Sequence, residues 1–241
     1  MICLFFLTTL FSAGNDSSAI VLKKMHDTYA GKWYHTLTFT QTTEIYMNDS
    51  LEQTQTWYEA IRFPDSFRID FGSPDSGNAV IWRHDSLFQF KKGKRLAARP
   101  NRNELLFQLG GMYFVPFDSV VPEFRRQGYD LSRFHSDTWQ GRPVYVIGAW
   151  AGDDTTRQLW IDREHLTAVR RLQKNEGNRE EDIFDGHQQV EGGWVETKIV
   201  FKSSDGYKQL EYYHDVKVNV ELDERLFDPK SFGKWHWFKK Q

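Results

Sequence analysis

The sequence feature that most constrains the fold is the stretch from Trp57 to Lys94. Four short runs rich in Ile, Val, Phe, Tyr and Trp alternate there with turn-forming residues at 64–66, 73–77 and 84–86. Runs of this length, with apolar alternation and tight turns, are typical of an antiparallel β-meander. The chain is therefore expected to contain an antiparallel sheet.

One face of this predicted sheet is strongly aromatic. Apolar and polar residues alternate along the runs, and successive side chains of a strand point to opposite faces. The alternation places Arg68 and Asp70 on one face, and the residues assigned to the opposite, apolar face are Phe67, Ile69, Phe71, Phe88 and Phe90. A face of this kind must be covered by another part of the protein.

The rest of the chain also favours β structure. Asn48-Asp49-Ser50 is expected to turn a Thr-rich strand at 33–46 into the strand that contains Trp57 and Ile61. Later turn signals recur about every ten residues, which is typical of one large sheet, sandwich or barrel. The later predicted strands are Pro143–Trp150, Arg157–Asp162, Thr167–Gln173, Glu181–Val190, Gly193–Lys202 and Tyr207–Val220.

Three segments have helical spacing instead. Ala19–Ala30 predicts an amphipathic helix that ends at Gly31. Asn103–Phe117, interrupted by Gly110-Gly111, and Ser119–Gln127 predict two short helices between the strand groups. Two interpretations of this pair stay open, a movable cover hinged at the two glycines or two ordinary packing helices.

The N-terminus predicts export. Ile2–Phe11 is an apolar run of the length found in secretory signal peptides, and small residues follow at 12–14 and 17–19. We expect a signal peptide at 1–19 and a single domain at 20–241, with cleavage after Gly14 or Ala19. The run lacks a basic segment before it, so translation is expected to start upstream of Met1. The alternative is a buried first strand.

Composition narrows the class of protein. A chain of 241 residues fits one large β domain, and a mean hydropathy of −0.63 argues against an integral membrane protein beyond the N-terminus. The net charge of −2 gives no sign of nucleic-acid binding. The one cysteine, Cys3, precedes the apolar run, where a lipid-modified cysteine would follow it.

The order of these elements resembles the lipoprotein-carrier family, with its LolA/LolB-like fold. Pro64 and Phe67 match a family strand-turn-strand in which an aromatic residue follows a proline by three positions, and 213–229 resembles the closing strand of lipoprotein-sorting proteins. The family's carrier arginine precedes that proline directly, but Phe63 stands there. Arg62 lies one residue earlier, on the opposite face of a strand, so it does not inherit that role.

The resemblance implies a mainly β (α+β) fold, in which a curved antiparallel sheet forms an incomplete barrel around a hydrophobic cavity, with an N-terminal helix and a short helical lid. The expected cavity residues are Leu37, Phe39, Trp57, Ile61, Phe67, Ile69, Phe71, Phe88 and Phe90. The expected lid residues are Leu105, Leu106, Leu109, Met112, Phe114 and Phe117. The alternative is that these residues fill a closed core.

Residues that could carry out chemistry are scattered. The eight histidines lack metal-ligand spacing, and neither a nucleophile elbow nor a phosphate-binding glycine loop occurs. The acidic pairs resemble a solvated charge run at 180–182 and a hairpin tip at 153–154. We therefore expect no enzymatic activity, no metal and no cofactor.

Together with the expected export, the resemblance implies a monomeric periplasmic carrier that binds the acyl chains of lipids, in particular of lipoproteins bound for the outer membrane. The alternative is a lipid-binding or envelope-sensing domain of the same fold that transports nothing. Transient contact with a membrane or a membrane complex is expected. The aromatic and basic tail, Phe232–Gln241, either makes that contact or docks on the sheet.

Overall fold

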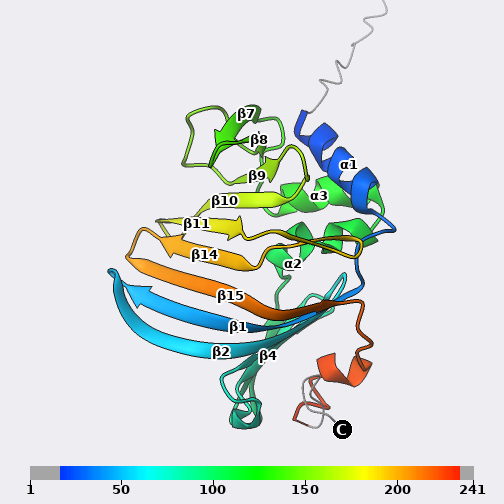
Figure 1. Cartoon of the computed structure of the whole chain (residues 1–241), viewed down its shortest axis with the longest axis vertical. Coiled ribbons are helices and arrows are strands. Elements are labelled where there is room, and N and C mark those ends of the chain that lie inside the picture. Colours follow the sequence, from blue (N-terminus) through cyan, green and yellow to red (C-terminus); the bar gives the residue numbers. More distant parts are fainter. Residues whose placement is uncertain (1–16, 234–241) are drawn as a thin grey trace, which may run out of the picture.

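The structure is a computed structural model and describes residues 17–233. A large antiparallel sheet dominates this part of the chain, with 13 strands in the order β6-β5-β4-β3-β2-β1-β15-β14-β11-β10-β9-β8-β7. Figure 1 shows the curved sheet from β7 at the top to β4 at the bottom. The terminal strands β6 and β7 are edges, so the sheet does not close. The predicted incomplete barrel is confirmed.

The sheet consists of two meanders that meet at its centre. The first contains β1 (Thr36–Met47), β2 (Ser50–Arg62), β3 (Ser66–Phe71), β4 (Ala79–Arg83), β5 (Ser86–Lys91) and β6 (Lys94–Pro100). The second contains β7 (Phe134–Trp139), β8 (Arg142–Ile147), β9 (Gln158–Asp162), β10 (Ala168–Asn175), β11 (Asn178–Asp185), β14 (Lys198–Ser203) and β15 (Tyr207–Val218). The last strand pairs with the first, Leu37 opposite Val218 and Met47 opposite Tyr207.

Two predicted strands are each divided in the structure. The end of the run at 181–190 and the start of the run at 193–202 lie outside the main sheet and pair with each other as the hairpin β12 (Gln188–Val190) and β13 (Gly193–Val195). The polar edge strands β6 and β7 were not predicted, because an edge strand with few apolar residues lacks the alternation on which such predictions rest.

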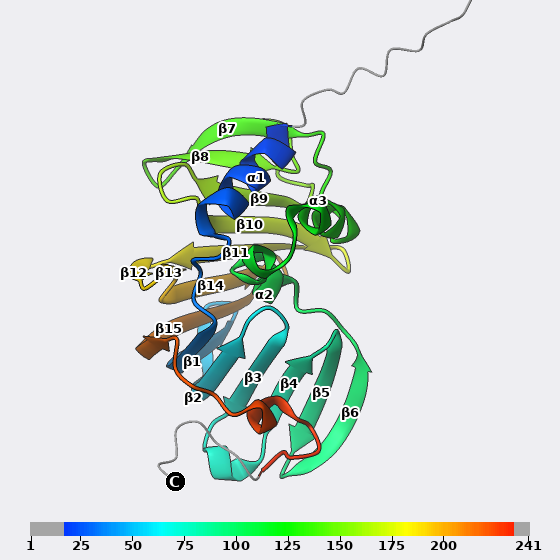
Figure 2. The same cartoon turned by 90° about the vertical axis from the view of Figure 1, so that its right-hand side faces the viewer.

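The helices lie on one face of the sheet, which we call the inner face. The helices are α1 (Ser17–Tyr29), α2 (Glu104–Gln108) and α3 (Phe117–Arg126), and the 3₁₀ turns are η1 (Pro74–Ser76), η2 (Gly111–Phe114) and η3 (Glu224–Phe227). Figure 2 shows α1 and α3 beside β7–β10 and α2 where the two meanders meet. Among residues 17–233, no helix is long and apolar enough to cross a membrane.

The first helix has the predicted amphipathic character and begins earlier than expected. Leu22 and Met25 are buried on its apolar side, whereas Ile20 is exposed. Ser18 is also fully buried, and its hydroxyl donates to the carbonyl of Arg133 at 3.0 Å. The folded domain therefore includes residues on the N-terminal side of the boundary expected at 19. The rest of the expected signal peptide lies outside the described residues.

The opposite, outer face of the first meander is covered by the C-terminal segment, residues 219–233. Figure 2 shows η3 of this segment against the lower strands. Its buried residues Leu226 and Phe227 pack against Ile81 of β4 and Phe90 of β5. The outer face thus has an apolar cover of its own, made by the last described part of the chain.

A buried ion pair lies beneath this segment. Arg68 and Asp70 project from β3 to the outer face, as predicted, and Arg68 donates two hydrogen bonds to the Asp70 carboxylate at 2.8 Å. Arg68 also donates to the carbonyl of Leu226 at 3.1 Å, and its guanidinium lies 5.0 Å from the ring centroid of Phe232. Both charged side chains are almost completely buried.

Candidate functional site

A cavity of about 340 Å³ lies between the inner face of the first meander and α2. Small-molecule sites usually have volumes of roughly 300–1,000 Å³ and mostly apolar walls. Strands β1, β2 and β3 form one wall, β14 and β15 form another, and α2 with the residues around it closes the side that faces the helices.

Six of the nine cavity residues predicted from strand alternation line this cavity. They are Leu37, Phe39, Trp57, Ile61, Phe67 and Ile69. They come together because paired residues of neighbouring antiparallel strands share a face. In the register, Leu37 is opposite Ile61, which is in turn opposite Phe67.

The other three predicted cavity residues are not in the lining. Phe71 is on the same face but lies at the end of β3, where its ring packs edge-on against Trp57 with 4.8 Å between centroids. The placement of Phe88 and Phe90 on the inner face was wrong. Leu87 pairs with Trp82 and so shares the inner face, which turns Phe88 and Phe90 to the outer face. Alternation alone does not fix which set faces inward, and a shift of one residue reverses the assignment.

The predicted lid divides into a part at the cavity and a part in the core. Leu105, Leu106 and Leu109 line the cavity from α2 and the residue after it. Met112 is fully buried in the main core. Phe114 stacks on Phe63 with 5.6 Å between centroids, and Phe117 packs edge-on against His26 of α1 at 5.6 Å. These three were wrongly placed at the cavity.

The two glycines after α2 are accounted for by close packing. A Cβ atom on Gly110 would lie 2.5 Å from the ring of Phe63, and one on Gly111 would lie 3.0 Å from the carbonyl oxygen of Pro64. Side chains at these positions would push the α2–η2 segment away from the sheet. Close packing accounts for both glycines, so no hinge is needed to explain them. This agrees with the interpretation of the two segments as ordinary packing helices.

Several of the residues that line the cavity were not predicted from the sequence. Phe63 and Trp82 belong to the first meander, and Trp82 stacks on Phe67 with 5.4 Å between centroids, as pairing of β3 with β4 requires. The other missed lining residues come from outside the first meander and are Tyr34, Asn103, Ile199, Phe201, Gln209 and Tyr213. No local signal links the later strands to the first meander before the pairing of β1 with β15 is known.

Three carboxylic acids were also missed, and they give the cavity its charge. Glu59 of β2, Glu211 of β15 and Glu196 before β14 all line it. Burial is the largest cause that raises the pKa of Glu59 well above its usual range, and the charge of Glu211 adds to it. Burial likewise raises the pKa of Glu196 and of Glu211 to about 7. Glu196 and Glu211 therefore change charge near neutral pH.

No positively charged residue of the lining is available to form an ion pair with these acids. Every lining side chain is apolar, aromatic, amide or carboxylic acid, with no Lys, Arg or His among them. The buried Arg171 projects from the same face at β10 but is already paired with Asp182 at 2.5 Å. The cavity is thus an apolar space whose polar groups are mostly hydrogen-bond acceptors. Within residues 17–233, no group of three or more His, Cys, Asp or Glu side chains is placed to hold a metal ion.

No family model matches the chain, and no curated protein is similar to it in sequence. Solved structures are similar in fold. The structure superposes on a DUF1329 family protein from Desulfovibrio piger with a TM-score of 0.62 at 12% identity, covering 90% of this chain and 98% of the other. For a putative outer membrane lipoprotein-sorting protein domain from Vibrio parahaemolyticus the TM-score is 0.61 at 11% identity, with coverage of 90% and 99%.

A third match is a LolA superfamily protein from Nitrosomonas europaea, with a TM-score of 0.55 at 12% identity and coverage of 88% and 98%. The chain has a LolA-like fold. The resemblance stated from Pro64, Phe67 and the closing strand is confirmed at the level of the fold. Because all three matches are distant in sequence, they show the LolA-like fold alone.

Arg62 and Phe63 lie on opposite faces of the sheet in this fold. Arg62 points to the outer face, where it donates to the carbonyl of Leu222 and lies 3.5 Å from the Glu224 carboxylate. Phe63, one residue later, lines the cavity. The predicted reversal of faces is confirmed, and an aromatic ring stands in the lining next to Pro64.

Proposed function

We propose that this protein binds the acyl chains of a lipid or lipoprotein in the cavity and carries them through the periplasm. The observation that supports the proposal most is a largely apolar cavity of about 340 Å³ between the inner face of the sheet and α2. Proteins seldom leave a space of this size empty, because interiors are packed about as densely as organic crystals. The fold and the lining both suit an apolar guest.

The energetics suit a carrier. Each methylene group that leaves water gains about 0.8 kcal/mol, and a bilayer offers about the same. A cavity that holds an acyl chain through water must therefore not hold it much better than a membrane does. A lining of Trp57, Phe67 and Leu106, closed by a helix of five residues, is suited to loading and release. The proposed activity needs no chemical step, no metal and no cofactor.

The proposed location follows from the expected signal peptide and from the fold. Cleavage after Gly14 would leave Ser18 in the mature protein and so keep the hydrogen bond from its hydroxyl to the carbonyl of Arg133. The partners proposed here are lipids or lipoproteins and, in passing, a membrane or a periplasmic protein. The expected membrane contact of the tail at 234–241 lies outside the described residues. A lipid-binding sensor that transports nothing would use the same cavity.

A carboxylate placed in the cavity wall tests the proposal. We expect Phe67→Glu and Ile69→Glu to fold and to lose binding of a pyrene-labelled acyl glycerol, an uncharged probe, because the new charge must be desolvated or protonated when the probe enters. Leu106→Glu should weaken binding from the other side of the cavity. Leu51→Glu is the matched control, since Leu51 is an exposed residue of β2 outside the lining.

Probe fluorescence and circular dichroism together decide the outcome. Folded Phe67→Glu and Ile69→Glu variants that bind the probe as well as the unmodified protein would refute the cavity assignment. Unfolding of both variants would favour a closed core, because nothing relaxes around a charge in a fully packed interior. Carriage is tested separately, by transfer of the labelled lipid between two vesicle populations. A sensor would bind without accelerating transfer.

A further inference from the structure

The three carboxylic acids of the cavity are not explained by acyl-chain binding. A purely apolar guest would be held better by apolar residues, since a carboxyl group in such surroundings must be desolvated or kept protonated. The acids reach the cavity from three separate segments, at Glu59, Glu196 and Glu211. A stray surface acid would not produce this convergence.

The acids have few partners within the described part of the chain. Glu211 accepts hydrogen bonds from the amide of Gln209 at 2.5 Å and from the hydroxyl of Tyr213 at 3.5 Å. For Glu59, which is 3% exposed, the described residues supply no hydrogen bond and no ion pair. Buried carboxyl groups in proteins are almost always paired.

The side-chain amide of Gln41, which lies nearby, also has an atom without a hydrogen-bond partner among the described residues. Gln41 of β1 is fully buried and pairs in register with Trp57 on one side and Tyr213 on the other, both of which line the cavity. Its amide nitrogen donates to Thr43 at 2.8 Å, while its side-chain oxygen has no partner among the described residues. Gln41 also lies within hydrogen-bonding reach of Glu211. The Gln41 oxygen on β1 and the Glu59 carboxyl on β2 therefore lie near Glu211 of β15 without a hydrogen-bond donor among the described residues.

We propose that the ligand of this cavity is an amphiphile whose polar end carries an ammonium group, held by Glu59, Glu211 and Glu196 while its apolar body lies against the aromatic wall. This inference rests on the proposed function, because it assigns the polar end of the same guest. An ammonium group supplies three donors and a positive charge, which the acceptors lack. A phosphate or free carboxylate would meet acids and no cation, so such groups would be rejected from this end of the cavity.

The groups that face the acids do not cancel their charge. Tyr34 and Tyr213 line the cavity and are held neutral, since burial raises the pKa of both well above their usual range. Asp182 adds negative charge near Glu211, and Arg171 is committed to Asp182. An ammonium guest is the missing positive charge.

Three guests with the same alkyl chain test this assignment. Tetradecylamine, tetradecanol and tetradecanoate compete for the cavity with 1-N-phenylnaphthylamine, an uncharged fluorescent dye. At pH 8 we expect the amine to bind at least about tenfold more tightly than the alcohol, the equivalent of one charged hydrogen bond. Tetradecanoate should bind more weakly than the alcohol. The preference for the amine should shrink at pH 5, where the acids are protonated before the guest arrives.

Variants of the acids tie the preference to them. Glu59→Gln and Glu211→Gln should each reduce the ratio of amine affinity to alcohol affinity, and the triple variant that adds Glu196→Gln should abolish the preference for the amine. Glu52→Gln is the matched control, because Glu52 is an exposed residue of the same strand as Glu59. Its amine preference should equal that of the unmodified protein.

The outcomes separate the two proposals. If the dye and tetradecanol bind while the amine has no advantage, or if its advantage survives in the triple variant, this inference is wrong and acyl-chain binding stands. If neither the dye nor any of the three guests binds, the proposed function fails and the inference fails with it.

Discussion

Two regions of the sheet, one at its β7 edge and one at its centre, use the same strand architecture but are packed differently. We call β7–β11 with α1 and α3 the closed half, and β1–β3 with β14, β15 and α2 the open half. In the closed half, Leu22, Phe124 and Leu159 are fully buried. In the open half, Trp57 and Phe67 are only partly buried and line a cavity. The inner face is apolar in both, so composition alone does not make the difference.

The length of the covering helices accounts for the difference. The closed half is covered by helices of 13 and 10 residues, roughly 20 and 15 Å long. The open half has α2, with five residues and a length of roughly 7.5 Å. Strand β2 alone has 13 residues and spans roughly 43 Å. A short helix over long strands leaves inner surface uncovered, and a cavity results.

Truncation of one aromatic ring in each half should show the largest contrast. Phe124→Ala should lower the free energy of unfolding by about 3–5 kcal/mol, because it opens a hole in packed surroundings. Phe67→Ala should cost only about 1–2 kcal/mol, because its ring already faces a space and part of its surface is never taken from water. Urea denaturation followed by circular dichroism measures both. Equal costs would mean that the open half is packed as tightly as the closed half.

On the outer face of the open half, the buried ion pair of Arg68 and Asp70 holds the C-terminal segment against the sheet. Asp70→Ala should cost about 3 kcal/mol, because it leaves a buried guanidinium without its carboxylate. Asp27→Ala, which breaks the exposed pair with Lys23 on α1, is the control and should cost well under 1 kcal/mol, roughly the value of a surface pair. A small effect at Asp70 would show that water reaches Arg68 and that the segment is not a firm cover.

How much of this contrast could be predicted from the sequence depends on the range of the interactions. The meander, the amphipathic α1 and the turn at Pro64 are local patterns and were predicted. The strand pairing that joins β1 to β15 spans most of the chain, and no local pattern contains it. The later wall of the cavity, including Ile199 and Glu211, was missed for this reason.

Two further misses have other physical causes. Phe88 and Phe90 were assigned to the wrong face because both faces of the first meander are buried, one by α2 and one by the C-terminal segment. An apolar run then fits either orientation. Glu59 was missed although strand alternation places it between Trp57 and Ile61 on their face, because a single acid in a strand resembles a solvent-facing residue.

The acids of the open half should make its stability depend on pH. Burial raises the pKa of Glu211 from its ordinary 4.5 to about 7. The folded state therefore binds an extra proton between these values, and stability falls as pH rises from about 4.5 to 7. Glu211→Gln should remove the part of that fall that Glu211 causes, which raises the free energy of unfolding at pH 8 by on the order of 2 kcal/mol, with little change at pH 4.5. A variant with the same pH profile as the unmodified protein would place Glu211 in contact with solvent.

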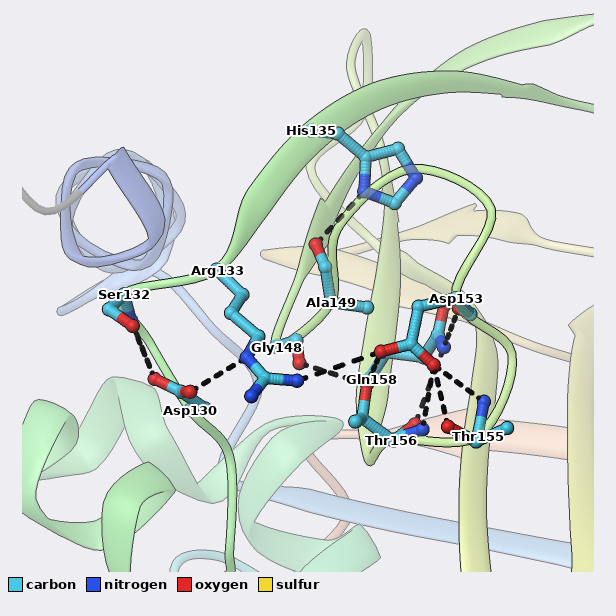
Figure 3. A network of polar contacts seen from close by, with 10 residues as sticks. All are labelled: Asp130, Ser132, Arg133, His135, Gly148, Ala149, Asp153, Thr155, Thr156 and Gln158. Atoms are coloured by element: carbon cyan, nitrogen blue, oxygen red, sulfur yellow. Dashed lines mark hydrogen bonds and ion pairs between the residues drawn. The ribbon is translucent and has the colours of Figure 1, made fainter.

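The closed half contains a carboxylate of the opposite kind, at Asp153 in the β8–β9 loop. Figure 3 shows its carboxylate facing Thr155, Thr156 and Arg133. One oxygen accepts from the backbone amide and the hydroxyl of Thr155, both at 2.8 Å, and the other accepts from the hydroxyl of Thr156 at 3.0 Å. These hydrogen bonds lower the pKa of Asp153 to about 2. The acidic pair predicted as a hairpin tip is indeed a tip, and one of its members organises the loop.

Replacement of Asp153 should have the smallest effect on stability of these changes. The pH dependence of its contribution should be opposite in sign to that of Glu211. Its pKa lies below the ordinary 3.8, so its stabilising contribution is complete above about pH 4 and is lost as pH falls toward 2. Asp153→Ala should therefore be slightly less stable than the unmodified protein at neutral pH and should converge with it near pH 2. Asp154→Ala is the matched control, because Asp154 is an exposed neighbour whose ion pair with Arg179 lies at the surface. Amide hydrogen exchange in 153–157 measures the loop directly, and unchanged protection in Asp153→Ala would mean that backbone contacts alone hold it. If both predictions hold, acid stabilises the open half through Glu211 and loosens this loop of the closed half through Asp153, so the two halves should respond to pH in opposite directions.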